Sequence, residues 1–464
     1  MSRDHAIAAI DDYYQNGDFE TELASRIAFK TESNLPNRDA ALEAYLERNL
    51  VPYLSNMGFI CNTYPNPRSD AGPFLVAKRI EGNNLPTVMT YGHGDVIAGY
   101  DDQWDNAMSP WDITKVGQRW YGRGTADNKG QHTINLAALR AVLNIRGSLG
   151  FNVTLLIEMG EERGSPGLRD FCEAHKDLFS ADVFIASDGP RIHPNKPTIF
   201  MGSRSVFNFT MRLDSHAGGH HSGNWGGLLT NPGVVMAHAL ASMIDRNGKI
   251  LVKGWRNTRI PNSVRAAIAK LDVGEGENTP DINPNWGEPD LTIAERVFAS
   301  NTFEVRAFET GNPKSPANAI PPSAVVFGHL RYVVGTDINQ LMPLLRNHLD
   351  KHGFDEITIT SERDMMPATR LDPDHPWAKW AIQSLSKTAN DEIAVLPNLG
   401  GSLPNDVFAD LLGLPTIWVP HSYAGCSQHA PNEHILESIS QSALRLMTGL
   451  WWDLGEGNTP RQIS

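Results

Sequence analysis

Seven side chains in this sequence are of types that bind divalent metal ions, and they follow short apolar or glycine-rich stretches. They are His93, Asp95, Asp127, Glu161, Glu162, Asp188 and His429. An ionised carboxylate at the end of a buried stretch is costly unless a cation neutralises it. Nitrogen and oxygen donors suit zinc, and manganese or cobalt also fits, without any thiolate. These residue types therefore indicate a candidate metal centre.

Two of the patterns suggest separate roles for neighbouring side chains. His93 and Asp95 are separated by one residue, and alternate residues at a strand end point the same way. Asp95 can therefore accept a hydrogen bond from the His93 ring and fix the tautomer of a metal-binding imidazole. Glu161 and Glu162 are adjacent, so one could bind metal while the other acts as a base. Taken singly, each pattern is also typical of a packing histidine or an exposed glutamate pair.

The glycine-rich segment 122–130 contains Asp127 and precedes a helical pattern. Its glycines permit a tight loop, and the ordinary interpretation is a solvated turn in which Asp127 caps the helix. A phosphate-binding loop is a rival, but neither G-x-G-x-x-G nor G-x-x-x-x-G-K-S/T is present. The acidic Asp127 would also repel an anion, which favours a cation as the ligand of this loop.

Short apolar segments precede these polar clusters and are typical of buried strands in a largely parallel sheet. They are 87–90, 153–157, 183–186 and 416–419, and helical patterns at 131–143 and 168–178 fall between them. Alternating strands and helices predict an α/β fold, here a mostly parallel-sheet α/β/α catalytic domain. Ligands of such sheets bind beyond the carboxyl ends of the strands, where the polar clusters would lie.

The segment 206–364 has a different pattern. At 207–213 apolar and polar residues alternate, as in a strand that buries one face. Helical patterns follow at 234–244 and 338–349, and strand patterns at 302–308, 324–333 and 356–360. The order β-α-β-β-α-β is that of a ferredoxin-like α+β unit. We therefore expect a catalytic domain of residues 1–205 and 365–464, interrupted by an inserted domain at 206–364.

The overall composition excludes several classes of partner. A formal net charge of -13 argues against nucleic acid and anionic membranes, because both attract basic surfaces. No apolar run approaches the roughly 18–20 residues that a membrane span needs. The first residues lack the apolar core of a signal peptide. The 3 cysteines are too few for a disulfide framework, so we expect a reducing, cytoplasmic location.

The order and spacing of these clusters resemble one family across nearly the whole chain. It is the family of dinuclear metallopeptidases that includes carnosine and cytosolic non-specific dipeptidases, glutamate carboxypeptidase, aminoacylase, acetylornithine deacetylase and succinyl-diaminopimelate desuccinylase. The resemblance implies two divalent ions. The implied ligands are His93 and Asp188 on one ion, Glu162 and His429 on the other, and Asp127 bridging both.

The same resemblance implies the remaining roles at the centre. Glu161 would be the general base, and Asp95 would orient His93. A cis peptide bond is implied between Asp127 and Asn128. The inserted domain would act as a lid and dimerisation domain.

A further match lies in that inserted domain. The stretch beginning His221-Ser222-Gly223 is similar to one in the dipeptidases, whose histidine enters the active site of the partner subunit and stabilises the oxyanion. The resemblance therefore implies a homodimer. His216 and His220 lie nearby, and the usual Asp-Leu before the histidine is absent, so the choice among the three histidines stays open.

Other matches concern the substrate. Asn318 and Arg331, 13 residues apart, match positions that bind the carboxylate end of the substrate. A buried or paired arginine is the ordinary interpretation, and a bidentate carboxylate clamp is the functional one. Gly401 and Ser402 belong to a stretch similar to a substrate-facing loop of the dipeptidases. The same residues are equally typical of an ordinary turn.

These observations predict an amide hydrolase. We expect two metal ions to activate a bridging water, Glu161 to move its proton to the leaving amine, and His221 to stabilise the oxyanion. A dipeptidase or carboxypeptidase acting on small peptides with a free carboxylate fits best. A deacylase of N-acyl amino acids is the main alternative, and a non-catalytic metal-binding homologue is a further one. A serine hydrolase is disfavoured because the sequence has no G-x-S-x-G elbow.

Overall fold

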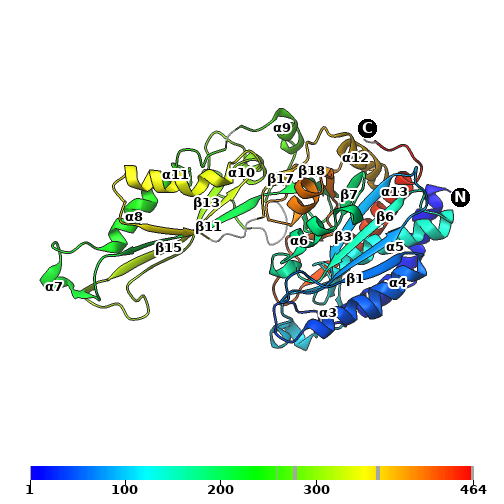
Figure 1. The fold of residues 1–464 in the computed structure, drawn as a ribbon, viewed down its shortest axis with the longest axis horizontal. Coiled ribbons are helices and arrows are strands. Elements are labelled where there is room, and N and C mark those ends of the chain that lie inside the picture. The colour runs from blue at the N-terminus through cyan, green and yellow to red at the C-terminus, as the bar shows by residue number, and fades with distance from the viewer. Residues whose placement is uncertain (1, 258, 275–279, 362–365, 461–464) are drawn as a thin grey trace.

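The larger part of the molecule is built on an eight-stranded sheet, which the computed structural model describes within residues 2–257, 259–274, 280–361 and 366–460 (Figure 1). In spatial order its strands are β1 (Ile60–Tyr64), β2 (Phe74–Arg79), β6 (Asn152–Glu158), β3 (Thr87–His93), β7 (Val183–Ala186), β19 (Thr416–Trp418), β9 (Thr198–Phe200) and β18 (Ala394–Leu396). The central strands β6, β3, β7 and β19 run parallel, and β1, β2 and β9 pair antiparallel with neighbours. The predicted fold class is confirmed.

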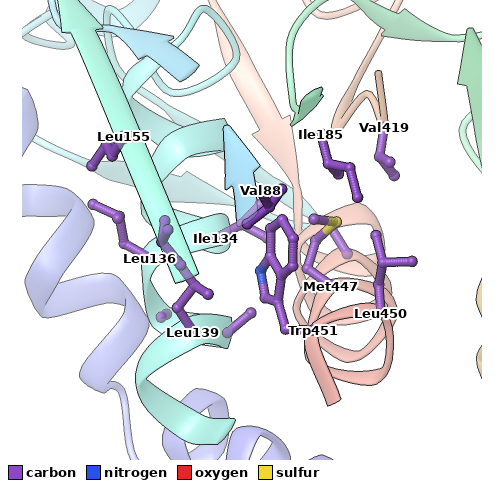
Figure 2. Packing of buried hydrophobic residues seen from close by; sticks show 14 of the residues in the cluster. Val88, Ile134, Leu136, Leu139, Leu155, Ile185, Val419, Met447, Leu450 and Trp451 are labelled. Carbon is purple, nitrogen blue, oxygen red and sulfur yellow. The ribbon is translucent and has the colours of Figure 1, made fainter. Parts of the chain in front are cut away.

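One face of this sheet is covered by helices that are amphipathic or largely buried. They are α1 (Arg3–Gln15), α2 (Asp18–Ile27), α3 (Asp39–Tyr45), α4 (Val51–Asn56), α5 (Lys129–Arg146), α12 (Pro376–Ala389) and α13 (Glu437–Leu454). Figure 2 shows Val88 of β3, Leu155 of β6 and Ile185 of β7 packed with residues of α5 and α13. Their sequence neighbours Met89, Leu156 and Phe184 belong to the core on the opposite face, because successive side chains of a strand alternate.

The opposite face is covered by short helices from two distant parts of the chain. They are α6 (Leu168–Ala174), α9 (Asn262–Ile268) and α10 (Ile293–Phe298). Phe171, Val264 and Phe298 from these helices pack in one core cluster with Trp418 of β19. The sheet is therefore buried on both faces, which explains why its central strands lack a polar side.

The smaller part of the molecule is an antiparallel sheet with helices on one face. Its strands, in spatial order, are β13 (Thr302–Thr310), β15 (Ser323–Tyr332), β11 (Ser205–Asp214) and β16 (Thr358–Ser361), and its helices are α8 (Pro232–Met243) and α11 (Ile338–Lys351). Phe207 and Phe209 of β11 face these helices, while the residues between them are half-buried. The strand order and the sequence β11-α8-β13-β15-α11-β16 are those of a ferredoxin-like unit.

Short strand pairs connect the loops around the two sheets. They are β4 (Thr114–Val116) and β21 (His434–Leu436) on either side of β5 (Arg119–Tyr121), β8 (Pro190–Arg191) with β20 (Ser422–Tyr423), β10 (Gly202–Ser203) with β17 (Thr369–Arg370), and β12 (His220–His221) with β14 (Ala319–Ile320). Helix α7 (Ser222–Trp225) follows β12 at the far end of the smaller sheet (Figure 1).

The division into domains at 205/206 and 364/365 stays a prediction, and its second boundary lies outside the described residues. Within the described ranges, no helix has both the length and the apolar character that crossing a membrane requires.

Candidate metal centre

The side chains of the predicted centre come from loops at one edge of the large sheet. His93 is the last residue of β3 and lies beside Glu158, the last residue of β6. Asp188 follows β7 by two residues, and Glu161 and Glu162 form a short turn after β6. Because β3, β6 and β7 are parallel, their carboxyl ends meet at the same edge.

Asp127 lies between two histidines. Its Oδ1 is 2.9 Å from Nε2 of His93, and its Oδ2 is 3.1 Å from Nε2 of His429. Gln428 also donates a hydrogen bond to Oδ2. The peptide bond between Asp127 and Asn128 is cis, as the resemblance implies.

Each oxygen of Asp127 thereby belongs to a different group of three ligand atoms. Asp188 completes the group of His93, with its Oδ2 at 3.7 Å from Nε2. Glu162 completes the group of His429, with its Oε2 at 2.8 Å from Nε2. Within each group the candidate ligand atoms lie within 4.8 Å of one another. Two adjacent three-residue groups that share a carboxylate are the arrangement that a pair of ions needs.

The carboxylates of this centre are held in a buried, strongly charged setting. Burial raises the pKa of Glu162 to about 7 and that of Asp188 to about 6, and the charge of Asp127 adds to both shifts. Burial also raises the pKa of Glu161 well above its usual range, against the opposing effect of a neighbouring imidazole. Hydrogen bonds to Asp127 and Glu162 raise the pKa of His429 to about 11. Burial and mutual repulsion therefore disfavour the ionised carboxylates, and a bound cation would stabilise them in that form.

The donor set fits divalent metal ions. Oδ2 of Asp188 is buried and has no hydrogen-bond partner in the described part of the chain, although an acceptor in such a place needs one. His93 is fully buried, and its Nε2 faces Asp127 and Asp188. Imidazole nitrogens and carboxylate oxygens are ordinary zinc ligands, and a bound ion would reverse the local pKa shifts.

Asp95 supports the centre in a way that the sequence did not reveal. Nδ1 of His93 lies nearer to the backbone oxygen of Asp95, at 3.1 Å, than to its carboxylate Oδ1, at 3.4 Å. The carboxylate instead accepts the backbone N–H groups of Glu161 and Glu162, each at 3.2 Å. Asp95 thus contacts both the histidine and the turn that carries the two glutamates.

Glu433 is a supporting residue to which the sequence assigned no role. Its Oε1 accepts backbone N–H groups from Gly124, Ala126 and Asp127, and its Oε2 is 2.7 Å from Nη1 of Arg123. Both side chains of this ion pair are 1% exposed. The available signal was an acid four residues after His429 together with an arginine between two glycines of the Asp127 loop.

Glu161 lies beside the two ligand groups without belonging to either. Its Oε2 is 3.9 Å from Nε2 of His93, and its side chain is 15% exposed. A carboxylate in this place can reach a molecule held by the neighbouring ligands and exchange a proton with it.

The predicted substrate residues form two further groups. Arg331 of β15 donates from Nη1 to Oγ of Ser402 at 3.0 Å, which joins the smaller sheet to the loop containing Gly401. His221 pairs with Ala319 across β12 and β14, so it lies next to Asn318. Figure 1 shows α7, which follows His221, at the opposite end of the molecule from β3 and β6.

His221 is more available than His216 or His220 to donate a hydrogen bond to another molecule. It is exposed, and its Nδ1 accepts the N–H of Gly223 at 3.1 Å, which leaves the proton on Nε2. His216 has its Nε2 at 2.7 Å from the carbonyl oxygen of Thr230, and His220 packs against Trp225.

The chain matches known proteins over most of its length. The model of peptidase family M20/M25/M40 matches residues 89–453. A rat protein named Beta-Ala-His dipeptidase is 30% identical over 92% of this chain and 89% of its own. A Corynebacterium striatum protein named Cysteinylglycine-S-conjugate dipeptidase is 29% identical over 82% of this chain and 83% of its own.

The fold is also that of a solved structure. An M20 family metallo-carboxypeptidase from Sulfolobus solfataricus superposes with a TM-score of 0.78 and 25% identity, over 94% of this chain and 99% of the other.

Proposed function

Because this chain belongs to peptidase family M20/M25/M40, we propose that it is a dipeptidase or carboxypeptidase that cleaves short peptides with a free carboxylate. The observation that carries the proposal is the Asp127 carboxylate, which presents one oxygen to each of two ligand groups. The names of the relatives, which are peptidases of short substrates or of carboxyl ends, support the same class of reaction.

We propose that the centre holds two divalent ions. Zinc fits the donor set best, and manganese or cobalt is the alternative. His93 and Asp188 would bind one ion, Glu162 and His429 the other, and Asp127 both. When bound, such a pair supplies a nucleophile at neutral pH and a Lewis acid for the scissile carbonyl.

Glu161 is the residue that moves the proton in this proposal. Its carboxylate takes a proton from the attacking water and then gives it to the nitrogen of the departing amine. Its place beside His93, within the buried cluster but outside both ligand groups, supports this role. Asp95 fixes the position of Glu161 through the backbone hydrogen bond at 3.2 Å.

Arg331 is proposed to bind the free carboxylate of the substrate. No carboxylate of the described residues lies within ion-pair distance of its guanidinium, and Ser402 holds Nη1 in place. A guanidinium that is not already paired with a carboxylate can bind one with two parallel hydrogen bonds. Asn318 and Gly401 would contact the same end of the substrate. N-acyl amino acids carry that carboxylate too, which keeps a deacylase as the second candidate.

His221 is proposed to act on the active site of a second copy of the chain, as the oxyanion donor. Its exposed place beside α7, remote from the metal ligands of its own chain, supports action in trans (Figure 1). Trp225 and Leu228 are 46% and 75% exposed on the same tip, which gives apolar surface to a dimer contact. The three cysteines are free, and we propose a cytoplasmic location.

A substrate screen on metal-reconstituted protein tests the proposed function. Dipeptides, longer peptides and N-acyl amino acids are compared, each with zinc, manganese or cobalt, and Glu161→Gln serves as the inactive control. The proposal requires dipeptides or carboxyl-terminal residues to be released faster than acyl groups. Preferential deacylation would replace it by the second candidate, and no turnover on any substrate would contradict both.

A further inference from the structure

A pocket that contains none of the candidate metal ligands lies between α12, α13 and the loop 194–197. Its volume is about 510 Å³, within the range of roughly 300–1,000 Å³ found for small-molecule sites. Its polar lining comes chiefly from Arg191, Ser438, Ser442 and Arg445, with Asp391 at the carboxyl end of α12. The proposed peptidase reaction uses none of these residues.

Arg191 gives this pocket a buried positive charge. Its side chain is 3% exposed, and no carboxylate of the described residues lies within 4 Å of it. Nη1 donates to Oγ of Ser442 at 2.9 Å and Nε to the carbonyl oxygen of Pro420 at 3.3 Å. Nη2 is buried and has no partner in the described part of the chain. Burial lowers the pKa of this guanidinium to about 10.

An unpaired buried charge of this kind is unusual for a purely structural arginine. Taking a guanidinium out of water costs several kcal/mol unless an opposite charge or a full set of acceptors compensates it. Arg26 and Arg123, which are also buried, each have a carboxylate within 4 Å. The environment of Arg191 supplies neutral acceptors only, so a negative charge in the adjoining pocket would stabilise it.

The α13 side of the pocket is suited to an anion as well. Ser438, Ser442 and Arg445 are four and three residues apart on α13, so they lie on one face of the helix. Ser442 accepts the hydrogen bond from Arg191, and Ser438 lies in the first turn, where the helix dipole favours negative charge.

The acids near the pocket already have cationic partners. Oδ2 of Asp391 is 3.0 Å from Nζ of Lys196, and Oδ2 of Asp11 is 3.6 Å from Nη1 of Arg445. Neither acid is a counter-charge for Arg191, which has no carboxylate within 4 Å among the described residues.

We propose that this pocket binds the oxyanion group, phosphate or carboxylate, of a small molecule at Ser438 and Arg445 of α13, beside the buried charge of Arg191. The volume exceeds that of a single oxyanion and leaves room for the rest of a small metabolite. The site is separate from the peptidase centre, so it stands whether or not the proposed function does.

Thermal unfolding of the metal-loaded full chain tests this site. Sodium phosphate, sulfate and citrate are titrated at constant ionic strength against sodium chloride. We expect a rise in Tm of about 2–5 °C at saturation, because a ligand that binds only the folded state stabilises it. Stabilisation by phosphate and sulfate assigns a phosphate group, and stabilisation by citrate alone assigns a carboxylate.

Variants separate this pocket from the metal centre, where anions could also bind. Arg445→Gln and Ser438→Ala should lose most of the rise in Tm, while Arg212→Gln, an exposed arginine of the smaller sheet, should keep it. Arg191→Met should fold and lose the response, and if it does not fold the other two variants decide. A rise that is equal in all variants, or absent with all three anions, overturns the proposal.

Discussion

The backbone N–H of Asp127 donates a hydrogen bond to Oε1 of Glu433, with a nitrogen–oxygen distance of 3.0 Å. Glu433 lies four residues after His429, so one buried carboxylate ties together the loops that carry two candidate metal ligands. Glu433 thus stabilises the positions of these two loops, although it is not a proposed ligand of either ion.

Glu433→Gln should weaken metal binding more than it changes the fold. The substitution leaves Arg123 without its buried ion-pair partner and puts an amide among three backbone N–H donors. Loss of a contact that orients ligands typically costs about 10–100-fold in metal affinity. Competition with a chelator measures this loss, and Glu309→Gln on exposed β13 is the matched control. A metal affinity equal to that of the control would show that Glu433 does not support the metal ligands.

Glu161→Gln and Glu162→Gln should separate catalysis from metal binding. Glu161 lies outside both ligand groups, so its variant should retain metal and lose about 10²–10⁴-fold in kcat. Glu162 lies 2.8 Å from His429 within one group, so its variant should lose metal first. Metal content by elemental analysis, measured beside kcat, distinguishes the two. If the Glu161 variant lost metal and the Glu162 variant kept it, Glu161 would be the ligand and Glu162 the base.

Arg331→Met should damage only the binding of substrates with a free carboxylate. The variant removes a charge-assisted contact, which is worth about 10–100-fold in kcat/KM. Carboxyl-terminal amides lack that contact and should be turned over by the variant and the wild type at similar rates. The ratio of kcat/KM for a peptide and its amide is the readout. An unchanged ratio would show that another residue binds the carboxylate.

Mixed dimers of His221→Ala and Glu161→Gln subunits should recover activity that neither parent has. If His221 acts in trans, one of the two sites in each mixed dimer combines an intact Glu161 with an intact His221. Random mixing should then restore about a quarter of wild-type turnover, as follows from the twofold symmetry of such a dimer. Dimers verified as mixed by mass spectrometry but without turnover would place the histidine elsewhere.

The fold could be predicted from the sequence because its burial patterns are simple. Val88 lies in a strand that is buried almost throughout, which is typical of a sheet covered on both faces. Phe207 and Phe209 alternate with less buried residues, which is typical of a sheet covered on one face. Residue type and position indicated a metal centre, and the family resemblance implied the full set of histidines and carboxylates that lie around Asp127 in the structure.

The supporting contacts could not be predicted, because they depend on backbone atoms and distant loops. The carboxylate of Asp95 binds two N–H groups of a turn 66 and 67 residues away, and Glu433 binds N–H groups more than 300 residues away. The hydrophobic periodicity of a sequence does not indicate which distant backbone groups a carboxylate binds. The packing of α9 and α10 on the large sheet is equally long-range, since Val264 and Phe298 join the core of Trp418.

Anomalous diffraction at the zinc edge, on crystals of zinc-reconstituted protein, shows whether two ions share the Asp127 carboxylate. We expect two peaks per chain, each about 2.0–2.2 Å from a different oxygen of Asp127, as zinc–carboxylate bonds require. One peak should also contact His93 and Asp188, and the other Glu162 and His429. A single peak, a pair of peaks away from Asp127, or no peak at all would contradict this expectation.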